Sequence, residues 1–407
     1  MMKLLLLLGV FLTSIECLLP FNQLKRIQSF RANSIMCGKK RNQENDEGSN
    51  FWLESLKARQ QEITQENYIL EQKWRNADCS SQIKLRLPDW TRRLDVEYPL
   101  AACGSASGHV YVANVETGEI IATTERKMDE KDNNKEEQMA SIDTCIKVER
   151  VRELLHYGAG MVGTVDIAFA GDLICVSNPL SDTSSVQIWR MGPESSQHLL
   201  FQGYMVGLEG IIVTCLELDE EYLWVGTADG DVFAYSHTET RNSLPLALQT
   251  QPKLKWKFQD SILSLSLQAE IGHGLVTTAT GSVELISIED DGQGKAVCSL
   301  YPPLTSKENI LTAILTRTNP DNENSYAIIG GGGDGSIWIQ PLNMDQHGEI
   351  SEEQPFKDPL TQISPPHLGP VKCLTSPVPG LLVSGGLDGS VRVWDIQEGA
   401  SLYQFVG

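Results

Sequence analysis

Residues 367–397, HLGPVKCLTSPVPGLLVSGGLDGSVRVWDIQ, decide the fold of this chain. Two runs of alternating apolar residues flank the dipeptide Asp388-Gly389, and each run has the length of a short β-strand. A tight hairpin needs residues that accept positive φ angles, and Asp-Gly supplies them. The stretch therefore predicts an antiparallel hairpin in which every second side chain points toward a neighbouring sheet.

The same pattern recurs along the chain. Each copy has an apolar alternation, a turn rich in Gly, Ser and Asp, and a second alternation. The aligned apolar residues after the six turns are Val110, Val186, Val232, Val283, Ile337 and Val391. Their separations are 76, 46, 51, 54 and 54 residues. Repeats of this period that are made only of strands indicate the blades of a β-propeller, so we expect an all-β fold.

The last repeat resembles a WD40 repeat nearly from end to end. Trp394-Asp395 matches the WD pair, and His367 stands near the family's Gly-His position, as His-Leu-Gly. In this family a His, a strand Ser or Thr, the turn Asp and the Trp form a hydrogen-bonded network. The resemblance implies these residues for that network: His367, Ser384, Asp388 and Trp394. They are structural positions rather than catalytic ones.

Other repeats keep parts of the WD40 pattern. Trp189 matches the tryptophan, although Arg190 replaces the following Asp. Asp229 and Asp334 hold the turn position in two further repeats. Six repeats are visible, whereas the family commonly closes with seven. The resemblance therefore implies a propeller of six or seven four-stranded blades over residues 80–407. The residue pattern of the segment before it predicts an N-terminal helix.

The first 43 residues predict a targeting leader in two parts. Residues 1–17 have one Lys, an apolar run and then small and polar residues, which is typical of a signal peptide. Residues 18–43 are basic, contain Ser and Asn, and hold no acid, which is typical of a transit peptide. The combination resembles the leader of plastid proteins in algae with secondary plastids. The alternative is a secreted protein with a basic propeptide.

Cysteine usage favours the plastid stroma over the secretory pathway. None of the nine cysteines belongs to a CxxC motif, and several lie inside apolar runs, where Cys acts as a small hydrophobic residue. After removal of the leader we expect no stable membrane insertion, because no later segment has 18 consecutive apolar residues.

Residues 44–79 are expected to form a helical segment, because 50–78 lack Gly and Pro. Five apolar residues spaced by 4, 7, 7 and 4 fall along one side of that helix: Trp52, Leu56, Ile63, Leu70 and Trp74. Two interpretations remain open. The helix packs on the domain that follows, or it forms a short coiled coil that contacts a partner.

The first gap between repeats is long enough to hold an insertion at about 125–157. Its first part is acidic and polar, and its second part has apolar residues at helical spacing: Met139, Ile142, Ile146, Val151, Leu154 and Leu155. The segment either covers a blade edge or acts as a docking arm for a partner.

No catalytic, cofactor-binding or metal-ligating motif is found in the sequence. The seven histidines are scattered, and Gly330–Gly333 lacks the Lys-Ser/Thr of a phosphate-binding loop. We therefore expect a non-catalytic scaffold for protein–protein interactions. The alternatives are a propeller enzyme or small-ligand sensor, and an assembly subunit recruited through the 50–78 helix.

Charge narrows the class of partner. The formal net charge of the whole chain is −20. The first 43 residues carry +6, so the remaining residues carry −26. Such a body repels phosphate backbones, and no nucleic acid is expected as a partner. The same field attracts cationic surfaces, so the expected protein partner is basic.

Overall fold

The structure of the 407-residue chain is a computed structural model. The residues that the structure describes are 46–78, 86–124, 142–155, 163–179, 185–192, 198–238, 246, 249, 251–268, 271–288, 296–300, 310–322, 324–345, 349–351 and 354–406. They fall into two compact units, one holding helix α2 and the other holding the strands and helix α3. No helix among these residues has the length and apolar content to cross a membrane.

Helix α2 spans Asp46–Arg75, inside the segment predicted to be helical. Two ion pairs lie along it, between Arg59 and Glu62 at 2.6 Å and between Arg75 and Glu71 at 2.7 Å. Spacings of three and four residues bring such side chains together on a helix surface. The helix ends at Arg75, and Ala77 in the turn that follows takes a φ of 53°.

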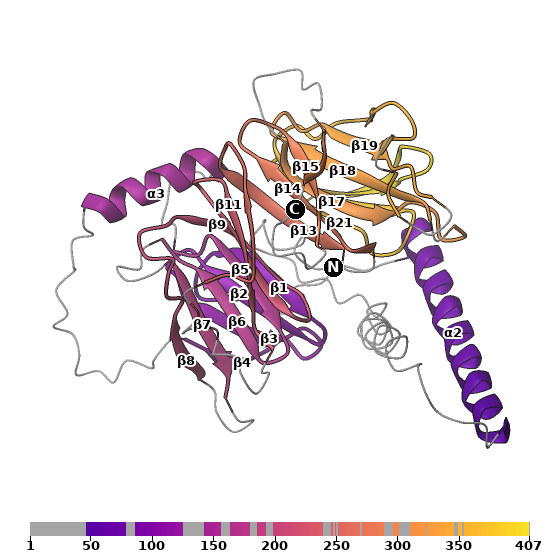
Figure 1. The fold of residues 1–407 in the computed structure, drawn as a ribbon, viewed down its shortest axis with the longest axis horizontal. Helices are drawn as coiled ribbons and strands as arrows, with labels where there is room; N and C mark the ends of the chain where they lie inside the picture. The colour runs from indigo at the N-terminus through magenta and orange to yellow at the C-terminus, as the bar shows by residue number, and fades with distance from the viewer. Residues whose placement is uncertain are drawn as a thin grey trace. The chain divides into compact units, whose positions relative to one another are not determined.

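The second unit contains six four-stranded antiparallel sheets, arranged as the blades of a β-propeller (Figure 1). This confirms the predicted all-β propeller class, and the described residues hold six blades. Blade 1 consists of β1 (Thr91–Glu97), β2 (Leu100–Ser105), β3 (Val110–Asn114) and β4 (Glu119–Thr123). Blade 2 consists of β5 (Asp166–Ala170), β6 (Leu173–Ser177), β7 (Val186–Met191) and β8 (Leu199–Tyr204). Blade 3 consists of β9 (Val213–Leu218), β10 (Tyr222–Thr227), β11 (Asp231–Ser236) and β12 (Leu254–Lys257).

Blades 4 to 6 continue in the same order. Blade 4 consists of β13 (Ile262–Gln268), β14 (His273–Thr278), β15 (Val283–Ser287) and β16 (Ala296–Leu300). Blade 5 consists of β17 (Ile310–Arg317), β18 (Tyr326–Gly332), β19 (Ile337–Pro341) and β20 (Thr361–Ile363). Blade 6 consists of β21 (Val371–Thr375), β22 (Leu381–Gly386), β23 (Ser390–Asp395) and β24 (Ala400–Val406). Helix α3 (Ile142–Leu155) lies between blades 1 and 2 in the sequence.

The turns between the second and third strands follow the sequence pattern. In three Asp-Gly turns the glycine takes a positive φ, at 87° for Gly230, 85° for Gly335 and 80° for Gly389. All six apolar residues that were aligned after the turns lie in third strands and are buried. Turn chemistry and strand period together set the register of these hairpins.

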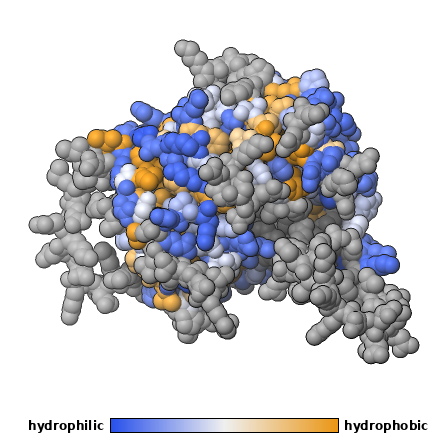
Figure 2. Space-filling model, in the orientation of Figure 1, coloured by the Kyte–Doolittle hydropathy of each residue, from blue (hydrophilic) through white to orange (hydrophobic). Residues whose placement is uncertain are grey.

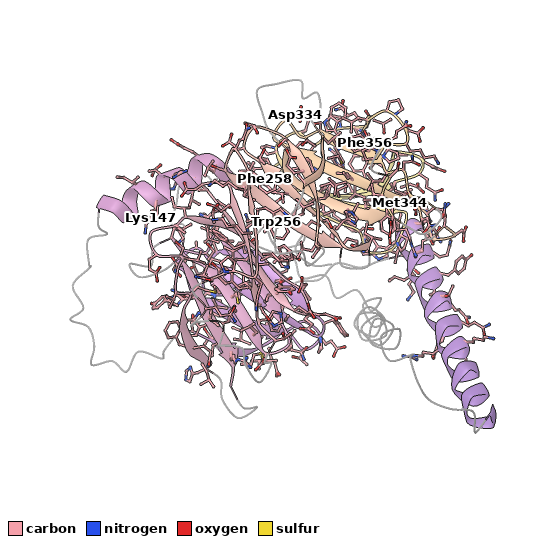
Figure 3. The ribbon with its side chains drawn as sticks, in the orientation of Figure 1. Lys147, Trp256, Phe258, Asp334, Met344 and Phe356 are labelled. Atoms are coloured by element: carbon pink, nitrogen blue, oxygen red, sulfur yellow. The ribbon has the colours of Figure 1, made fainter. Side chains whose placement is uncertain are left out.

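Each blade buries its faces against its neighbours in the sequence. One apolar cluster joins blades 3 and 4 and includes Trp224, Trp256 and Ile262. Similar clusters join blades 1 and 2, 2 and 3, 4 and 5, and 5 and 6. Figure 3 labels Trp256 and Phe258, which follow this pattern at the boundary between blades 3 and 4. A four-stranded sheet has two apolar faces, so the blades are stable only as an array.

Carboxylates on the first strands link the first three blades. Asp95 on β1 accepts a hydrogen bond from the backbone N–H of Phe169 on β5 at 2.8 Å. Asp166 on β5 accepts one from the N–H of Leu216 on β9, also at 2.8 Å, and pairs with Arg93 at 3.4 Å. The first strands therefore lie side by side along the inside of the array.

Glycines on second strands allow this close approach. A methyl group at Gly331 on β18 would lie 2.5 Å from Cγ1 of Val371, the first residue of blade 6. A methyl group at Gly226 would likewise lie too close to the side chain of Ile262, and one at Gly104 too close to the side chain of Thr164. Contacts this short cannot be accommodated without a shift, so the absence of a side chain at these positions sets the distance between blades.

We predict that Gly331→Ala lowers the free energy of unfolding by about 1–3 kcal/mol, because the added methyl overpacks the boundary between blades 5 and 6. Gly330→Ala is the matched control, since its methyl would meet Ile310 at an ordinary 3.4 Å. Thermal unfolding of the two variants measures the difference. Equal melting temperatures would contradict this role for Gly331.

Candidate functional site

A chain of hydrogen bonds crosses blade 6 and joins the four residues named for the WD40 network. The indole N–H of Trp394 donates to Oγ of Ser384 at 2.8 Å, and that Oγ lies 2.8 Å from Nε2 of His367. On the other side of the ring, Nδ1 lies 3.2 Å from Oδ1 of Asp388. The four side chains come from the connection before β21, from β22, from the turn and from β23.

This arrangement is satisfied by a neutral imidazole. Because Ser384 accepts from Trp394, its own hydroxyl proton is free to donate to Nε2, and Nδ1–H then donates to Asp388. Protonation of Nε2 would leave the serine hydroxyl without an acceptor in the chain. Burial accordingly lowers the pKa of His367, and the neighbouring carboxylate of Asp388 offsets only part of the effect.

Asp388 remains ionised at the same site. Burial acts to raise its pKa, but hydrogen bonds outweigh this and lower the pKa to about 2. The donors are the N–H groups of Leu368 and Ser390, the hydroxyl of Ser390 and the ring of His367. The carboxylate therefore fixes the loop before β21 against the turn before β23.

Arg392 is a buried member of this region that the sequence patterns did not identify. Its guanidinium donates to the carbonyl oxygens of Pro365 at 2.7 Å and Pro366 at 2.9 Å. It also lies 5.9 Å from the ring centroid of Trp394. Asp395, the second residue of the WD pair, accepts a hydrogen bond from the N–H of Glu398 in the next turn.

The other blades use parts of this scheme. In blade 5, Asp334 (labelled in Figure 3) accepts from the N–H of Ser336 at 3.0 Å, and Ser336 accepts from the indole of Trp338 at 2.9 Å. In blade 2, Trp189 packs on Phe201 with ring centroids 4.8 Å apart. Neither site contains an equivalent of His367. Among the residues that the structure describes, the four hydrogen-bonded residues of this network therefore occur together in blade 6.

Blade 1 reverses the positions of the acid and its donor. Asp89 lies in the connection before β1, where blade 6 has His367, and it accepts from the N–H of Ser107 in the turn at 2.8 Å. The sequence pattern missed this pair because it placed the acid only in the turn. The physical result is the same, since one carboxylate ties the connection to the turn.

Asp229 in blade 3 points outward and contacts helix α3. Arg150 of α3 donates to Oδ1 of Asp229 at 3.0 Å and to the carbonyl oxygen of Ala228 at 2.9 Å. We call the end of the propeller that carries these turns and the connections into the first strands the loop face. Helix α3 lies on the loop face beside the ends of β9 and β11 (Figure 1), and Lys147 marks it in Figure 3.

Three side chains of α3 pack on the loop face: Val148, Val151 and Leu154. Val151 is fully buried, but Ile146 is 60% exposed. The side of α3 that faces the blades therefore runs through Val148, and Ile146 lies outside it. Met139 lies outside the described residues, as do the side chains of Ile142 and Leu155.

Large apolar side chains also stand free on the loop face. Leu368 is 92% exposed, Leu387 60% and Trp90 72%. Their backbone N–H groups hold these segments in place. The N–H of Leu368 donates to the carboxylate of Asp388 at 2.9 Å, and the N–H of Leu387 donates to the carbonyl oxygen of Pro370 at 2.8 Å. The N–H of Ala106 likewise donates to the carbonyl of Trp90 at 2.8 Å. These side chains are thus presented on fixed backbone.

Of the five partner contacts predicted on the N-terminal helix, the structure describes the side chains of Leu70 and Trp74, and both are buried. Tyr68 and Ile69 on the same helix are exposed. The side chains of Trp52, Leu56 and Ile63 lie outside the described residues.

Within the described ranges, no group of three or more His, Cys, Asp or Glu side chains is placed to hold a metal ion. The five described cysteines are free thiols: Cys103, Cys175, Cys215, Cys298 and Cys373. Burial raises the pKa of each of them, to about 12 for Cys103 and about 11 for Cys298, so these groups are poor nucleophiles.

We predict that Ser384→Ala lowers the free energy of unfolding by about 1–3 kcal/mol, because it leaves the indole N–H of Trp394 and Nε2 of His367 buried and unpaired. The same substitution in a Trp394→Phe background should cost less, since one of those groups is already gone. Thermal unfolding of the single and double variants measures this coupling. Strictly additive effects would show that Ser384 does not link the two rings.

We also predict that acid weakens this site. The pKa of Asp388 is about 2 in the folded chain and about 4 in an unfolded one, so the carboxylate contributes about 2 kcal/mol above pH 4, and this is lost as the pH falls toward 2. The lowered pKa of His367 acts in the same direction, because the unfolded chain takes up that proton more readily. The stability difference between the native chain and Asp388→Asn should therefore shrink between pH 5 and pH 2.5. A difference that stays constant over that range would refute the assignment.

Comparison with known proteins bears on one blade. The family model described as "WD domain, G-beta repeat" matches residues 359–395, which include β20 to β23. No curated protein matches the chain. The crystal structure of the computationally designed Ika8 protein is 16% identical, with a TM-score of 0.47 over 79% of this chain and 75% of that chain, and at this level it adds nothing to the assignment. The matched repeat and the six-bladed propeller together support a WD40-repeat family.

Proposed function

We propose that the chain is a non-catalytic scaffold whose loop face binds a basic protein partner within a multiprotein assembly. WD40 propellers are generally scaffolds for protein interactions and are typically non-enzymatic. The observation that carries the proposal for this chain is the exposure of Leu368, Leu387 and Trp90 on one face.

Exposed apolar side chains of this size support a contact surface. Leu368 and Leu387 lie on the two segments that Asp388 joins, so they project from the same rigid corner of blade 6. Because the backbone of these segments is already fixed, it loses little conformational freedom when a partner covers the side chains, which favours binding. Trp is also among the residues that contribute most to binding energy at interfaces. Figure 2 shows other hydrophobic residues interspersed with hydrophilic ones on the face in view.

The charge of the body supports a basic partner. Residues 44–407 carry −26, and a field of that sign speeds the encounter with a cationic surface. It also opposes binding to nucleic acids. Helix α2, with Tyr68 and Ile69 exposed, would be an accessory contact for assembly.

We propose the plastid stroma as the place of action, after removal of residues 1–43. The support is the basic leader in front of an acidic body and the free state of the five described cysteines. Free buried thiols are what a reducing compartment maintains. The secretory pathway is the alternative.

We predict that Leu368→Ser combined with Leu387→Ser reduces the partner retained in an affinity capture from plastid extract at least tenfold. The expected loss follows from about 2 kcal/mol at an interface hot spot. Leu200→Ser is the matched control, because Leu200 is also exposed but lies on β8, the outer strand of blade 2.

The same capture tests the charge of the partner. A basic partner should elute as salt rises from about 0.05 to 0.5 M, over which the screening length falls from roughly 14 to 4 Å. Equal retention by the double variant and the control would sink the loop-face assignment. Retention that ignores salt would sink the basic partner.

We further predict that residues 1–60 fused to a fluorescent protein direct it to plastids, because residues 1–43 combine a signal-like and a transit-like segment. Fluorescence microscopy in an alga with secondary plastids reads the outcome. A fusion that lacks residues 18–43 is the control and should lose plastid import. Secretion of the complete fusion into the medium would contradict the proposal.

A further inference from the structure

We infer that the surface beneath α3 is a docking site for an amphipathic helix of a protein partner with one basic side chain, and that α3 occupies this site within the chain. The inference rests on the proposed function, because it names a surface and a partner class for the scaffold. Its basis is the apolar cluster that three side chains of α3 form with residues of four blades.

The surface is an apolar floor built from several blades. The floor is formed by connections, first strands and turns of blades 2, 3, 4 and 5. Its buried residues are Val165, Ile212, Ala228, Leu263 and Leu311, and Ala279 is partly buried. Each belongs to the loop-face end of its blade. An apolar floor of this kind favours a ligand that covers it with branched aliphatic side chains.

Helix α3 shows which ligand fits. Val148, Val151 and Leu154 are three residues apart, so they lie along one side of the helix and meet the floor. Arg150 lies at the edge of this contact, where it reaches both the carboxylate of Asp229 and the carbonyl of Ala228. A partner helix that fits this surface would therefore carry three aliphatic residues at intervals of three positions. It would also carry one arginine next to the middle aliphatic residue.

The blades do not need α3 for their own structure. Each of the six sheets has four strands without it, and α3 donates no strand pairing to any of them. Its ion pair is exposed, at 45% for Arg150 and 54% for Asp229, so solvent competes for it. A helix of 14 residues is also only marginally stable by itself. Release of α3 therefore leaves complete blades and an uncovered floor.

The attraction of the site for a partner helix agrees with the charge of the propeller. The turn Ala228–Asp229 offers a carbonyl and a carboxylate to one guanidinium. A basic partner, as proposed above, would supply such a guanidinium. The partner would replace α3 by making the same contacts, and a second copy of α3 itself is the simplest probe of that geometry.

The test measures binding of a fluorescein-labelled peptide of residues 142–155 to the full-length chain by fluorescence anisotropy. Val151→Asp in the full-length chain should release α3, because a carboxylate cannot be buried in the apolar floor. The native peptide should bind this variant at least tenfold more tightly than it binds the native chain, where α3 competes at a high effective concentration. Near-ultraviolet circular dichroism establishes that the variant keeps its blades.

Peptide variants test the individual contacts. Val151→Asp in the peptide should abolish binding, whereas Glu153→Gln, on the exposed side of the helix, should leave it unchanged. Arg150→Glu in the peptide should weaken binding about threefold to tenfold. Asp229→Arg in a Val151→Asp chain should restore the binding of that peptide, because the charges are then exchanged.

If Val151→Asp prevents folding, Arg150→Glu combined with Leu154→Ser in the full-length chain serves instead, since it removes both hydrogen bonds of Arg150 and one apolar contact with the floor. Absence of peptide binding to a folded, α3-released chain would overturn the inference, and so would binding that ignores Val151→Asp in the peptide. Either result leaves partner retention by Leu368 and Leu387 intact, so failure here is distinguishable from failure of the proposed function.

Discussion

The structure depends on one constraint, that a four-stranded sheet with two apolar faces must be covered on both. Consecutive blades meet this demand for one another, and the approach distance is set where second-strand glycines meet the next first strand, as at Gly331 and Val371. The carboxylates of Asp95 and Asp166 then bridge the first strands with charged hydrogen bonds. Packing therefore fixes the interior, while the connections and turns at the loop face are left to vary.

The turn position shows this freedom most clearly. In blade 6 Asp388 points inward and ties a loop to a turn, with an ionised carboxylate beside a neutral His367. In blade 3 the equivalent Asp229 points outward and holds α3 through Arg150. The same residue type at the same position thus serves the fold in one blade and a surface contact in another.

The sequence predicted the features that depend on residues close to one another along the chain. Strand alternation and Asp-Gly turns predicted the blades, and the resemblance to a WD40 repeat implied Ser384, Asp388 and Trp394, which the structure joins through His367. It could not predict contacts between distant segments, such as Arg150 with Asp229, which are 79 residues apart. It also missed Asp89 with Ser107, because exchanging donor and acceptor leaves the geometry intact but changes the pattern. Helical spacing alone could not decide whether Ile146 or Val148 faces the blades.

The measurement that tests the account most directly is native-state hydrogen exchange, which compares the amides of α3 with those of β9 and β13 beneath it. If α3 is an exchangeable occupant of the loop face, its amides exchange through local opening, at least a hundredfold faster than the central amides of those strands. If α3 and the strands exchange at the same rate, α3 opens only when the blades unfold, and it is a fixed part of the propeller.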